Sequence, residues 1–285
     1  MEKKTKQLRD LLSQPGLTLA PFAYDAFAAR IAEETGFSAV YMSGFGVSMS
    51  RGIPDFGLLT QTEMVQNATY IAQSVDIPVI ADADTGYGNP INTFRTVQEY
   101  ERSGVAAIHI EDQVTPKKCG FFEGKDVIPL DEAVAKIRSA VDARSDPDFV
   151  IIGRSDALAV NGWEDTINRC KAFYQAGADI VFVDGIKTRE DLRNYADHLK
   201  DIPRMYNGQL PVSDVDALGF KIQIHRGPMF GLHTAISSFM KELFETGAMD
   251  QDADGDGAEL REAITKTLKI DKLLEMESKY STKKE

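Results

Sequence analysis

Hydrophobic residues along the chain fall into short apolar runs that alternate with longer stretches of helical periodicity. The short runs predict eight strands, at Leu17–Pro21, Ala39–Ser43, Pro78–Asp82, Ala106–Glu111, Phe149–Arg154, Ile180–Val183, Arg204–Tyr206 and Lys221–His225. The longer stretches predict helices near Ala26–Thr35, Gln61–Ser74, Asn92–Ser103, Leu130–Ala143, Trp163–Ala176, Arg189–Leu199, Val212–Leu218 and Met229–Phe244. This alternation indicates an α/β protein.

Glycine follows several helix candidates at the position where a left-handed residue ends a helix. The residues concerned are Gly36, Gly104, Gly177, Gly219 and Gly247. Four of these glycines precede a strand candidate, a recurrence that indicates parallel strands with right-handed crossovers. Because eight strands are expected, a closed (β/α)8 TIM-type barrel is favoured over an open doubly wound sheet. We expect residues 1–247 to form this barrel as one catalytic domain.

The composition changes after Gly247. The acidic tract over 249–257 resembles the start of a calcium loop, but Arg261 stands at the twelfth position, where a bidentate Glu is needed. We therefore interpret residues 248–285 as an acidic linker followed by one helix over Glu259–Lys279. The apolar stripe of this helix needs a surface to pack on. That surface is either the barrel or a neighbouring subunit, and the second choice implies an oligomer.

Composition narrows the possible functions. At 285 residues and 43% hydrophobic content, the chain can bury a large core. A formal net charge of −12 argues against a nucleic-acid partner. We find neither an apolar run of membrane-spanning length nor a secretory signal, so no membrane partner is expected. Cys119 and Cys170 are too few for a disulfide framework, which favours a reducing compartment. We expect a cytoplasmic protein, with an organelle as the alternative.

Carboxylates stand at the ends of two strand candidates. Asp82 and Asp84 end the third strand, and Glu111 ends the fourth, where Asp112 follows. Acidic residues two positions apart at a strand end point the same way and can share one hard divalent cation. Carboxylates at the ends of separate parallel strands are typical of a barrel with its active site at the C-terminal face.

A loop with paired lysines follows the Glu111 strand, over Val114–Lys125. Its length and glycines indicate a mobile lid at the mouth of the barrel. Cys119 lies next to Lys117 and Lys118, and nearby positive charge favours the thiolate, which suits proton transfer or nucleophilic attack. Cys170 lies within a helix candidate, and we assign it to packing.

These motifs resemble the isocitrate lyase and phosphoenolpyruvate mutase superfamily, and most of all 2-methylisocitrate lyase and related 2-substituted malate lyases. The motifs are Tyr41-Met42-Ser43-Gly44, Pro54-Asp55-Phe56-Gly57, Asp82-Ala83-Asp84-Thr85-Gly86-Tyr87-Gly88, His109-Ile110-Glu111-Asp112-Gln113, Lys117-Lys118-Cys119-Gly120 and Gly153-Arg154-Ser155-Asp156-Ala157. The resemblance implies a barrel whose last helix is often exchanged with a neighbouring subunit in a dimer of dimers. It also implies Mg²⁺ or Mn²⁺ and a small 2-hydroxy or 2-oxo dicarboxylate. No organic cofactor is expected, since Gly86-Tyr87-Gly88 lacks the spacing of a dinucleotide site.

The resemblance also assigns residue roles. The implied metal ligands are Asp82 and Asp84, with Asp55 and Glu111 completing the outer sphere. The implied substrate contacts are Tyr41, Ser43, Gly44, Asp55, Arg154 and Asn207. Among these, Arg154 suits bidentate binding of a carboxylate. The implied catalytic residues are Cys119, Arg154 and Glu111, and Cys119 would protonate the enolate-like carbon released on cleavage.

The chain departs from the resemblance in three places. Phe121 stands where a histidine usually follows the cysteine motif, and Asp184 replaces a glutamate at the end of the sixth strand. The segment Gly208–Pro211, after Asn207, lacks the usual acidic residue. Two of these changes lie around the far end of the expected substrate. We therefore expect the distal carboxylate to be bound differently or to be absent.

The expected function is metal-dependent cleavage of a C–C bond in a small 2-hydroxy dicarboxylate of the methylisocitrate or 2-substituted malate type. The products would be an oxo acid, such as pyruvate, and a carboxylate. Oxaloacetate hydrolase or decarboxylase activity, C–P phosphonomutase activity and an inactive barrel with a binding role are the alternatives. Among the histidines, His109, His198 and His233 are assigned structural or solvated roles, and His225 is the exception because it ends the eighth strand.

Overall fold

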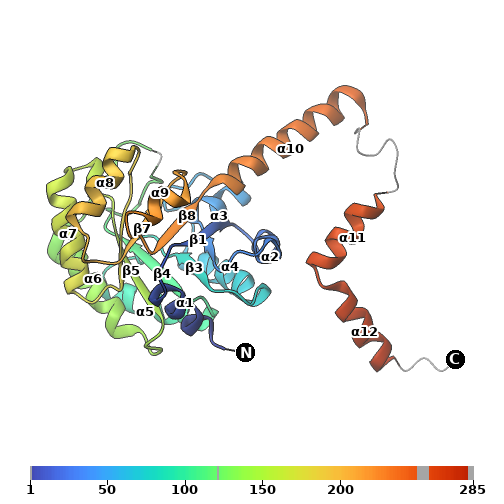
Figure 1. The fold of residues 1–285 in the computed structure, drawn as a ribbon, viewed down its shortest axis with the longest axis horizontal. Helices are drawn as coiled ribbons and strands as arrows, with labels where there is room; N and C mark the ends of the chain where they lie inside the picture. Colours follow the sequence, from blue (N-terminus) through green and yellow to red (C-terminus); the bar gives the residue numbers. More distant parts are fainter. Residues whose placement is uncertain (1, 121, 249–256, 282–285) are drawn as a thin grey trace. The chain divides into compact units, whose positions relative to one another are not determined.

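The computed structural model describes residues 2–120, 122–248 and 257–281. Its first compact unit, residues 1–228, is built on eight parallel strands that close into a barrel (Figure 1). The strands are β1 (Thr18–Ala23), β2 (Val40–Met42), β3 (Val79–Asp82), β4 (Ala107–Glu111), β5 (Val150–Ser155), β6 (Ile180–Val183), β7 (Arg204–Asn207) and β8 (Ile222–His225). The predicted TIM-type fold is confirmed.

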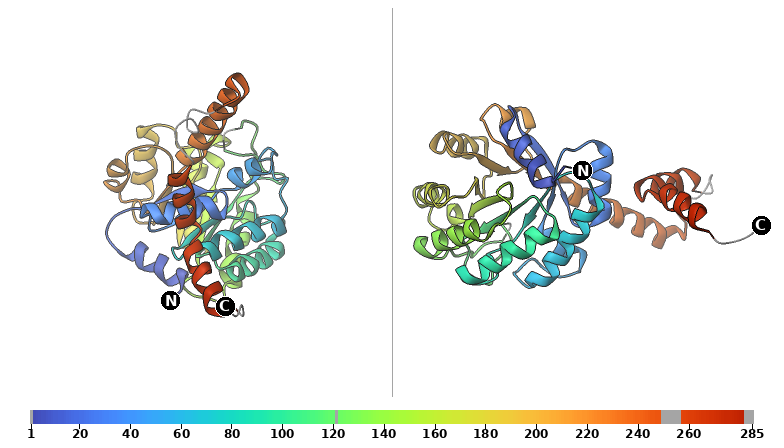
Figure 2. Two further views of the ribbon diagram at one scale, coloured as in Figure 1. Left: turned by 90° about the vertical axis from the view of Figure 1, so that its right-hand side faces the viewer. Right: turned by 90° about the horizontal axis from the view of Figure 1, so that it is seen from below.

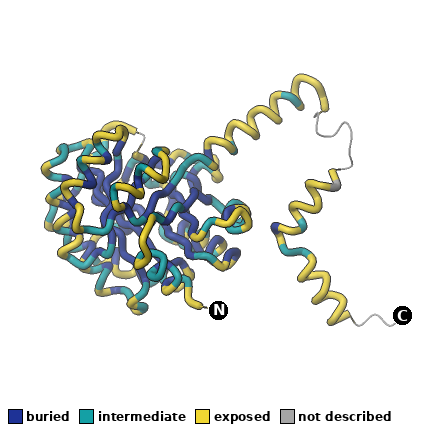
Figure 3. The backbone as a smooth tube through the Cα atoms, in the orientation of Figure 1, coloured by how far each residue is buried: buried dark blue, intermediate teal, exposed yellow. Residues whose placement is uncertain are grey.

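The barrel closes where β1 pairs with β8, from Thr18 opposite Ile222 to Pro21 opposite His225. Nearly every strand residue is buried, because side chains fill the inside of the barrel and helices cover the outside (Figure 3). Strand order around the barrel follows the sequence, so each strand's C-terminal end opens to the same face. The carboxylates at the ends of β3 and β4 lie at that face.

Helices surround the strands (Figures 1 and 2). They are α1 (Lys4–Ser13), α2 (Ala26–Thr35), α3 (Gly44–Ser50), α4 (Gln61–Ser74), α5 (Pro90–Ser103), α6 (Leu130–Ala143), α7 (Trp163–Gln175), α8 (Arg189–His198) and α9 (Val212–Asp216), with a 3₁₀ turn at Ala157–Ala159. Local sequence sets their ends: capping boxes begin α4 at Thr60 and α5 at Asn89. Gly36 and Gly104 end α2 and α5 in the left-handed conformation, as predicted.

Two helices were not predicted. α1 is polar and buries the side chains of Thr5 and Leu8, so its hydrophobic signal is weak. It is held by Arg9, which forms an ion pair with Asp179. α3 has seven residues, two of them glycines, and follows β2 directly, so its sequence lacks helical periodicity.

The second compact unit spans residues 229–285, so the expected division at 247 falls inside it. It contains most of α10 (Gly227–Thr246), then α11 (Ala258–Thr267) and α12 (Ile270–Tyr280). The prediction of one helix over Glu259–Lys279 is wrong, because Lys269 adopts a left-handed conformation (φ 54°) that separates α11 from α12. The acidic tract over 249–256 lies outside the described residues.

Most described residues of the second unit are exposed (Figure 3), and many of them are apolar. On α10 they are Phe230, Ile236, Phe239, Met240, Leu243 and Phe244, and on the last two helices they include Leu260, Leu273, Leu274 and Met276. None of the described helices combines the length and hydropathy needed to cross a bilayer. The expectation that these apolar faces need a partner surface stays a prediction.

Candidate active site

A cavity of about 510 Å³ opens at the C-terminal ends of the strands. Its lining residues come from nearly all sides of the barrel, and among them are Phe22, Tyr41, Ser43, Asp55, Asp82, Lys117, Cys119, Arg154, Asp184, Tyr206, Asn207 and Arg226. Most of the predicted site residues therefore meet in one space. Asp84, Glu111 and Gly44 lie directly beside this lining through contacts with Lys117, Arg154 and Asp82.

The Asp82 carboxylate lies at the centre of a hydrogen-bonded group at the ends of β2–β4. It accepts backbone N–H bonds from Gly44 and Asp84, each at 3.0 Å. The hydroxyl of Tyr41 lies 2.6 Å from Nε2 of His109, whose same nitrogen is 3.5 Å from Asp82. A side chain at position 44 would lie 2.7 Å from the Asp82 carboxylate, so glycine is required there.

Lys117 has a role that the sequence did not indicate. Its ammonium nitrogen lies 2.6 Å from the Asp55 carboxylate and 2.9 Å from that of Asp84. The backbone N–H of Cys119 also donates to the carbonyl of Asp55 at 3.0 Å. The loop over 114–125 is thus tied to β3 and to the segment around Asp55, and the buried Cys119 faces the cavity.

Arg154, at the end of β5, is surrounded by carboxylates. Its Nη1 lies 3.0 Å from Glu111, and its Nε and Nη2 donate to Asp156 at 2.8 and 3.0 Å. Nη2 is also 3.5 Å from Asp184. Most guanidinium donors are therefore engaged by the protein, and the predicted contact between Arg154 and a substrate carboxylate stays a prediction.

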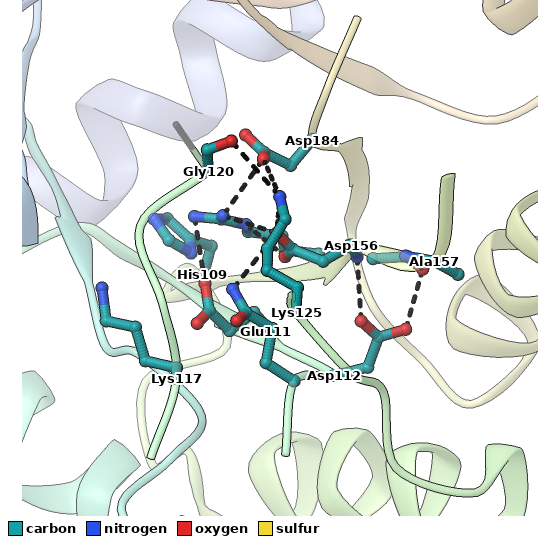
Figure 4. Close-up of polar contacts among 12 residues, drawn as sticks. His109, Glu111, Asp112, Lys117, Gly120, Lys125, Asp156, Ala157 and Asp184 are labelled. Carbon is teal, nitrogen blue, oxygen red and sulfur yellow. Dashed lines mark hydrogen bonds and ion pairs between the residues drawn. The ribbon is translucent and has the colours of Figure 1, made fainter. Parts of the chain in front are cut away.

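Lys125, at the end of the same loop, connects two of these carboxylates (Figure 4). Its ammonium lies 3.1 Å from Asp156 and 3.2 Å from Asp184, and it also donates to the carbonyl of Gly120. Asp156 is fixed from behind by Asp112, which accepts its backbone N–H at 2.9 Å. The sequence analysis assigned no role to Lys125 or Asp156, because the sequence does not show which distant charges pair. Phe121 lies outside the described residues.

Burial and neighbouring charge set the ionisation of the acidic groups. Burial by itself raises the pKa of Asp82, but the charges of Lys117 and Arg154 and the backbone N–H of Asp84 bring this pKa down to about 2. Burial raises the pKa of Asp84 to about 6 and that of Glu111 well above its usual value, despite the ammonium and guanidinium beside them.

Burial and neighbouring charge also set the pKa values of His109 and Asp184. Burial lowers the pKa of His109 to about 4, so this ring is neutral at pH 7. Burial alone would raise the pKa of Asp184, yet the adjacent Arg154 and Lys125 lower it to about 2.

The site contains more acidic groups than its cations balance. Lys117, Lys125 and Arg154 are in ion-pair contact with Asp55, Asp84, Glu111, Asp156 and Asp184, and Asp82 lies 3.5 Å from the neutral His109. In addition, Oε1 of Glu111 is buried and has no hydrogen-bond partner among the described residues. Both observations fit a hard divalent cation, which prefers carboxylate oxygens.

The carboxylates do not form a ready-made metal site. Across residues 2–120, 122–248 and 257–281, no three His, Cys, Asp or Glu side chains converge as a ligand set. Lys117 instead supplies the positive charge beside Asp84. A cation held there would need oxygen ligands from water or substrate in addition, which is usual for Mg²⁺.

The closed barrel and this cavity define a TIM-barrel enzyme with its site at the C-terminal face of the strands. The model of the family described as phosphoenolpyruvate phosphomutase matches residues 8–243, and the chain belongs to this family. The 2,3-dimethylmalate lyase of Eubacterium barkeri is 38% identical over 285 residues, covering 97% of this chain and 98% of the relative. The predicted superfamily is thereby confirmed.

Two solved structures extend the comparison to other reactions. Oxaloacetate acetylhydrolase bound to 3,3-difluorooxalacetate has a TM-score of 0.90 and 34% identity, covering 97% of this chain and 96% of that one. Phosphonopyruvate hydrolase in complex with oxalate and Mg²⁺ has a TM-score of 0.87 and 28% identity, covering 98% and 99%. The individual residue roles stay predictions for this chain.

Proposed function

We propose that the protein is a Mg²⁺-dependent lyase that cleaves a C–C bond in a small 2-hydroxy dicarboxylate of the 2-substituted malate type. The products are an oxo acid such as pyruvate and a carboxylate. The observation that carries this proposal is the presence of Asp82, Cys119 and Arg154 in the lining of one cavity. Asp82 would bind the cation, Cys119 would supply an acid, and Arg154 would supply a positive charge around one small substrate. The similarity to 2,3-dimethylmalate lyase supports this substrate class.

Asp82 and Asp84 would hold the cation, with Asp55 and Glu111 in its outer sphere, and Mn²⁺ is an acceptable substitute. When bound, the cation polarises the substrate's 2-oxygen and stabilises negative charge there. Lys117 holds Asp55 and Asp84 in place, since its ammonium contacts both carboxylates. The similarity to a phosphonopyruvate hydrolase that binds oxalate and Mg²⁺ supports this assignment.

Cleavage requires a base that takes the proton of the 2-hydroxyl group and an acid that protonates C3 after the bond between C2 and C3 breaks. We assign the first role to Glu111, whose Oε1 has no hydrogen-bond partner among the described residues. As the bond between C2 and C3 breaks, its electron pair passes to C3 and the attached carboxylate. Arg154 stabilises that charge, and the Cys119 thiol gives its proton to C3. Tyr41, Ser43, Gly44 and Asn207 orient the substrate.

The loop over 114–125 excludes water during this step. Lys117 ties the loop to Asp84, and Lys125 ties it to Asp156 and Asp184. A site closed in this way prevents water from protonating the carbanion before Cys119 does. In this proposal, the acid and the barrier to water belong to the same segment.

Oxaloacetate hydrolysis is the second candidate. Asp184 is engaged by Arg154 and Lys125, so these two cations are already paired and do not await a third carboxylate. An oxaloacetate-sized substrate has no such carboxylate, and oxaloacetate acetylhydrolase is structurally similar. C–P chemistry and an inactive barrel remain the further alternatives.

A product screen distinguishes these candidates. The wild-type protein is incubated with Mg²⁺ and each of 2,3-dimethylmalate, 2-methylisocitrate, citramalate, oxaloacetate and phosphonopyruvate, and products are identified by NMR. The lyase assignment predicts an oxo acid and a second carboxylate from a substituted malate. Oxalate and acetate from oxaloacetate alone would replace the lyase by the hydrolase, and pyruvate with phosphate from phosphonopyruvate would establish C–P cleavage.

We also propose that the chain forms a homo-oligomer, a dimer of dimers, through the second unit. The support is the row of exposed apolar side chains on α10–α12. Light scattering measures the mass directly. A tetramer of this 31.5 kDa chain is expected, and a monomer at micromolar concentration would overturn the assignment.

A further inference from the structure

We propose that three buried side chains outside the cavity are positioning residues for the divalent cation: Tyr100, Thr96 and Lys136. They hold the backbone of residues 82–88, which we call the cation loop because it carries the two carboxylates assigned to that cation. The inference rests on the proposed function and deepens it, since it names what sets the affinity of the same site for its cation. The three side chains are not part of the cavity lining, so they act through the backbone rather than on the substrate.

The cation loop has an unusual backbone. Asp84 and Tyr87 adopt the left-handed conformation, at φ 46° and 58°, and Gly86 between them has φ 80°. Residues other than glycine are disfavoured in this region, so such a loop persists only where its surroundings fix it. Within the loop, the N–H of Gly86 donates to the carbonyl of Ala83 at 2.9 Å. Further support comes from side chains outside the loop.

Tyr100, on α5, contacts the cation loop at two points. Its hydroxyl donates to the carbonyl of Asp82 at 2.9 Å and lies 3.2 Å from the hydroxyl of Tyr87. The pairing of β3 with β2 ends at Ala81, so the carbonyl of Asp82 lies beyond that ladder. Tyr100 is completely buried, and a polar group in the interior is stable where it is hydrogen-bonded. The phenol therefore joins the residue that carries the first carboxylate to one with a left-handed backbone.

The other two donors hold the middle of the loop. The hydroxyl of Thr96, also on α5, lies 3.0 Å from the carbonyl of Gly86. The ammonium of Lys136, on α6, donates to the carbonyl of Thr85 at 3.1 Å. Both side chains are buried, and a hydrogen bond from a charged donor is stronger than one between neutral groups. Two helices thus fix consecutive carbonyls of the loop.

The position of this backbone determines where the two carboxylates lie. The N–H of Asp84 donates to the Asp82 carboxylate at 3.0 Å, and the carbonyl of Asp84 accepts the N–H of Glu111 at 2.9 Å. A shift of the loop would therefore move both carboxylates together. A divalent cation binds most tightly where its oxygen ligands are already in place, because binding then carries no cost of ordering them.

The size of the effect follows from the hydrogen bonds. Loss of one such bond corresponds to roughly 3- to 10-fold in an equilibrium constant. Where the loop leaves the conformation that binds the cation, the apparent affinity falls with the population of that conformation. We therefore expect each donor to change the affinity for the cation by up to this factor.

The test measures binding of Mn²⁺ alone to the full-length protein, from the electron paramagnetic resonance signal of free Mn²⁺. The variants Tyr100→Phe and Thr96→Val each remove one hydroxyl without changing the charge. Tyr195→Phe and Thr166→Val are the matched controls, because these residues are also completely buried and their hydroxyls donate to carbonyls outside the cation loop at 2.8 Å. The Tm of every variant is measured alongside.

Tyr100→Phe and Thr96→Val should each weaken Mn²⁺ binding by roughly 3- to 10-fold. The two controls should change it by less than about twofold, although loss of a buried hydroxyl lowers Tm by about 2–4 °C in them as well. Unchanged Mn²⁺ affinity in either variant would overturn the assignment of that residue. Equal weakening in the variants and their controls would show general destabilisation and overturn the inference.

Lys136→Met separates positioning from charge. Lys136 lines the same small void as Glu111, so loss of its positive charge alone would strengthen binding of a cation. Weaker Mn²⁺ binding in Lys136→Met is expected because the hold on Thr85 is lost, and unchanged or tighter binding would overturn the role of Lys136. If the wild type binds Mn²⁺ and all three variants bind it equally well, the inference fails alone. If the wild type does not bind Mn²⁺, the cation assignment of the proposed function fails as well.

Discussion

Lys117 Nζ lies 2.9 Å from Oδ1 of Asp84, so the loop over 114–125 is joined directly to the end of β3. Both side chains are almost completely buried. Their charges stabilise each other, and removal of the ammonium would leave a buried carboxylate without its partner. In the absence of divalent cations, the loop and the acidic site therefore depend on each other.

We predict that Lys117→Met lowers the free energy of unfolding by about 3 kcal/mol, because breaking a buried pair strands a charge. Urea unfolding in EDTA measures this change. Lys118→Met is the matched control: its ammonium donates to the exposed carbonyl of Gly124, and its loss should cost less than about 1 kcal/mol. Equal effects of the two substitutions would mean that the contacts with Asp55 and Asp84 do not stabilise the fold.

The second prediction concerns closure of the loop. Lys125→Met removes the contacts with Asp156 and Asp184, so the loop should open more often and admit water. Hydrogen exchange of the amides over 114–124 should accelerate by about 10-fold, which corresponds to about 1.4 kcal/mol. Lys187→Met, at the cavity rim, should leave that exchange unchanged. Unaltered exchange in Lys125→Met would show that Lys125 does not hold the loop.

The third prediction concerns the cation. With Mg²⁺ and oxalate at about 100 times the dissociation constant, binding should stabilise the folded protein by about 2.7 kcal/mol, or several degrees in Tm. Asp82→Asn should abolish this shift, since it removes a carboxylate charge from the site. Asp76→Asn, an exposed substitution, should keep it. The same shift in EDTA, or in Asp82→Asn, would contradict the assignment of Asp82 to the cation.

Much of the barrel could be predicted because its strands are continuous apolar runs and its helices end at glycines. The carboxylates were also visible, since Asp82, Asp84 and Glu111 stand at strand ends. The break between α11 and α12 could not be predicted, because Lys269 adopts a left-handed conformation without a glycine or proline to signal it.

The partners of the lysines could not be predicted either. Lys117 was expected to act as a loop charge beside Cys119 and Lys125 had no assigned role, whereas both connect the loop to carboxylates distant in the sequence. Such pairs join residues distant in sequence, and spacing along the chain carries no signal for them. The acidic groups of the site could thus be predicted, while the cations that balance them required the fold.

The most direct test of the proposed function is the rate of oxo-acid release from the best substituted malate, with Mg²⁺, for wild type and Cys119→Ser. A general acid contributes about 10²–10⁴ to the rate, so kcat should fall by that factor while oxalate binding persists. Cys170→Ala, a substitution within α7, should keep near-normal kcat as the control. Release of an oxo acid in wild type and its loss in Cys119→Ser is the predicted result. Equal rates in the two proteins, or no oxo acid from any substituted malate despite bound Mg²⁺ and oxalate, would contradict it.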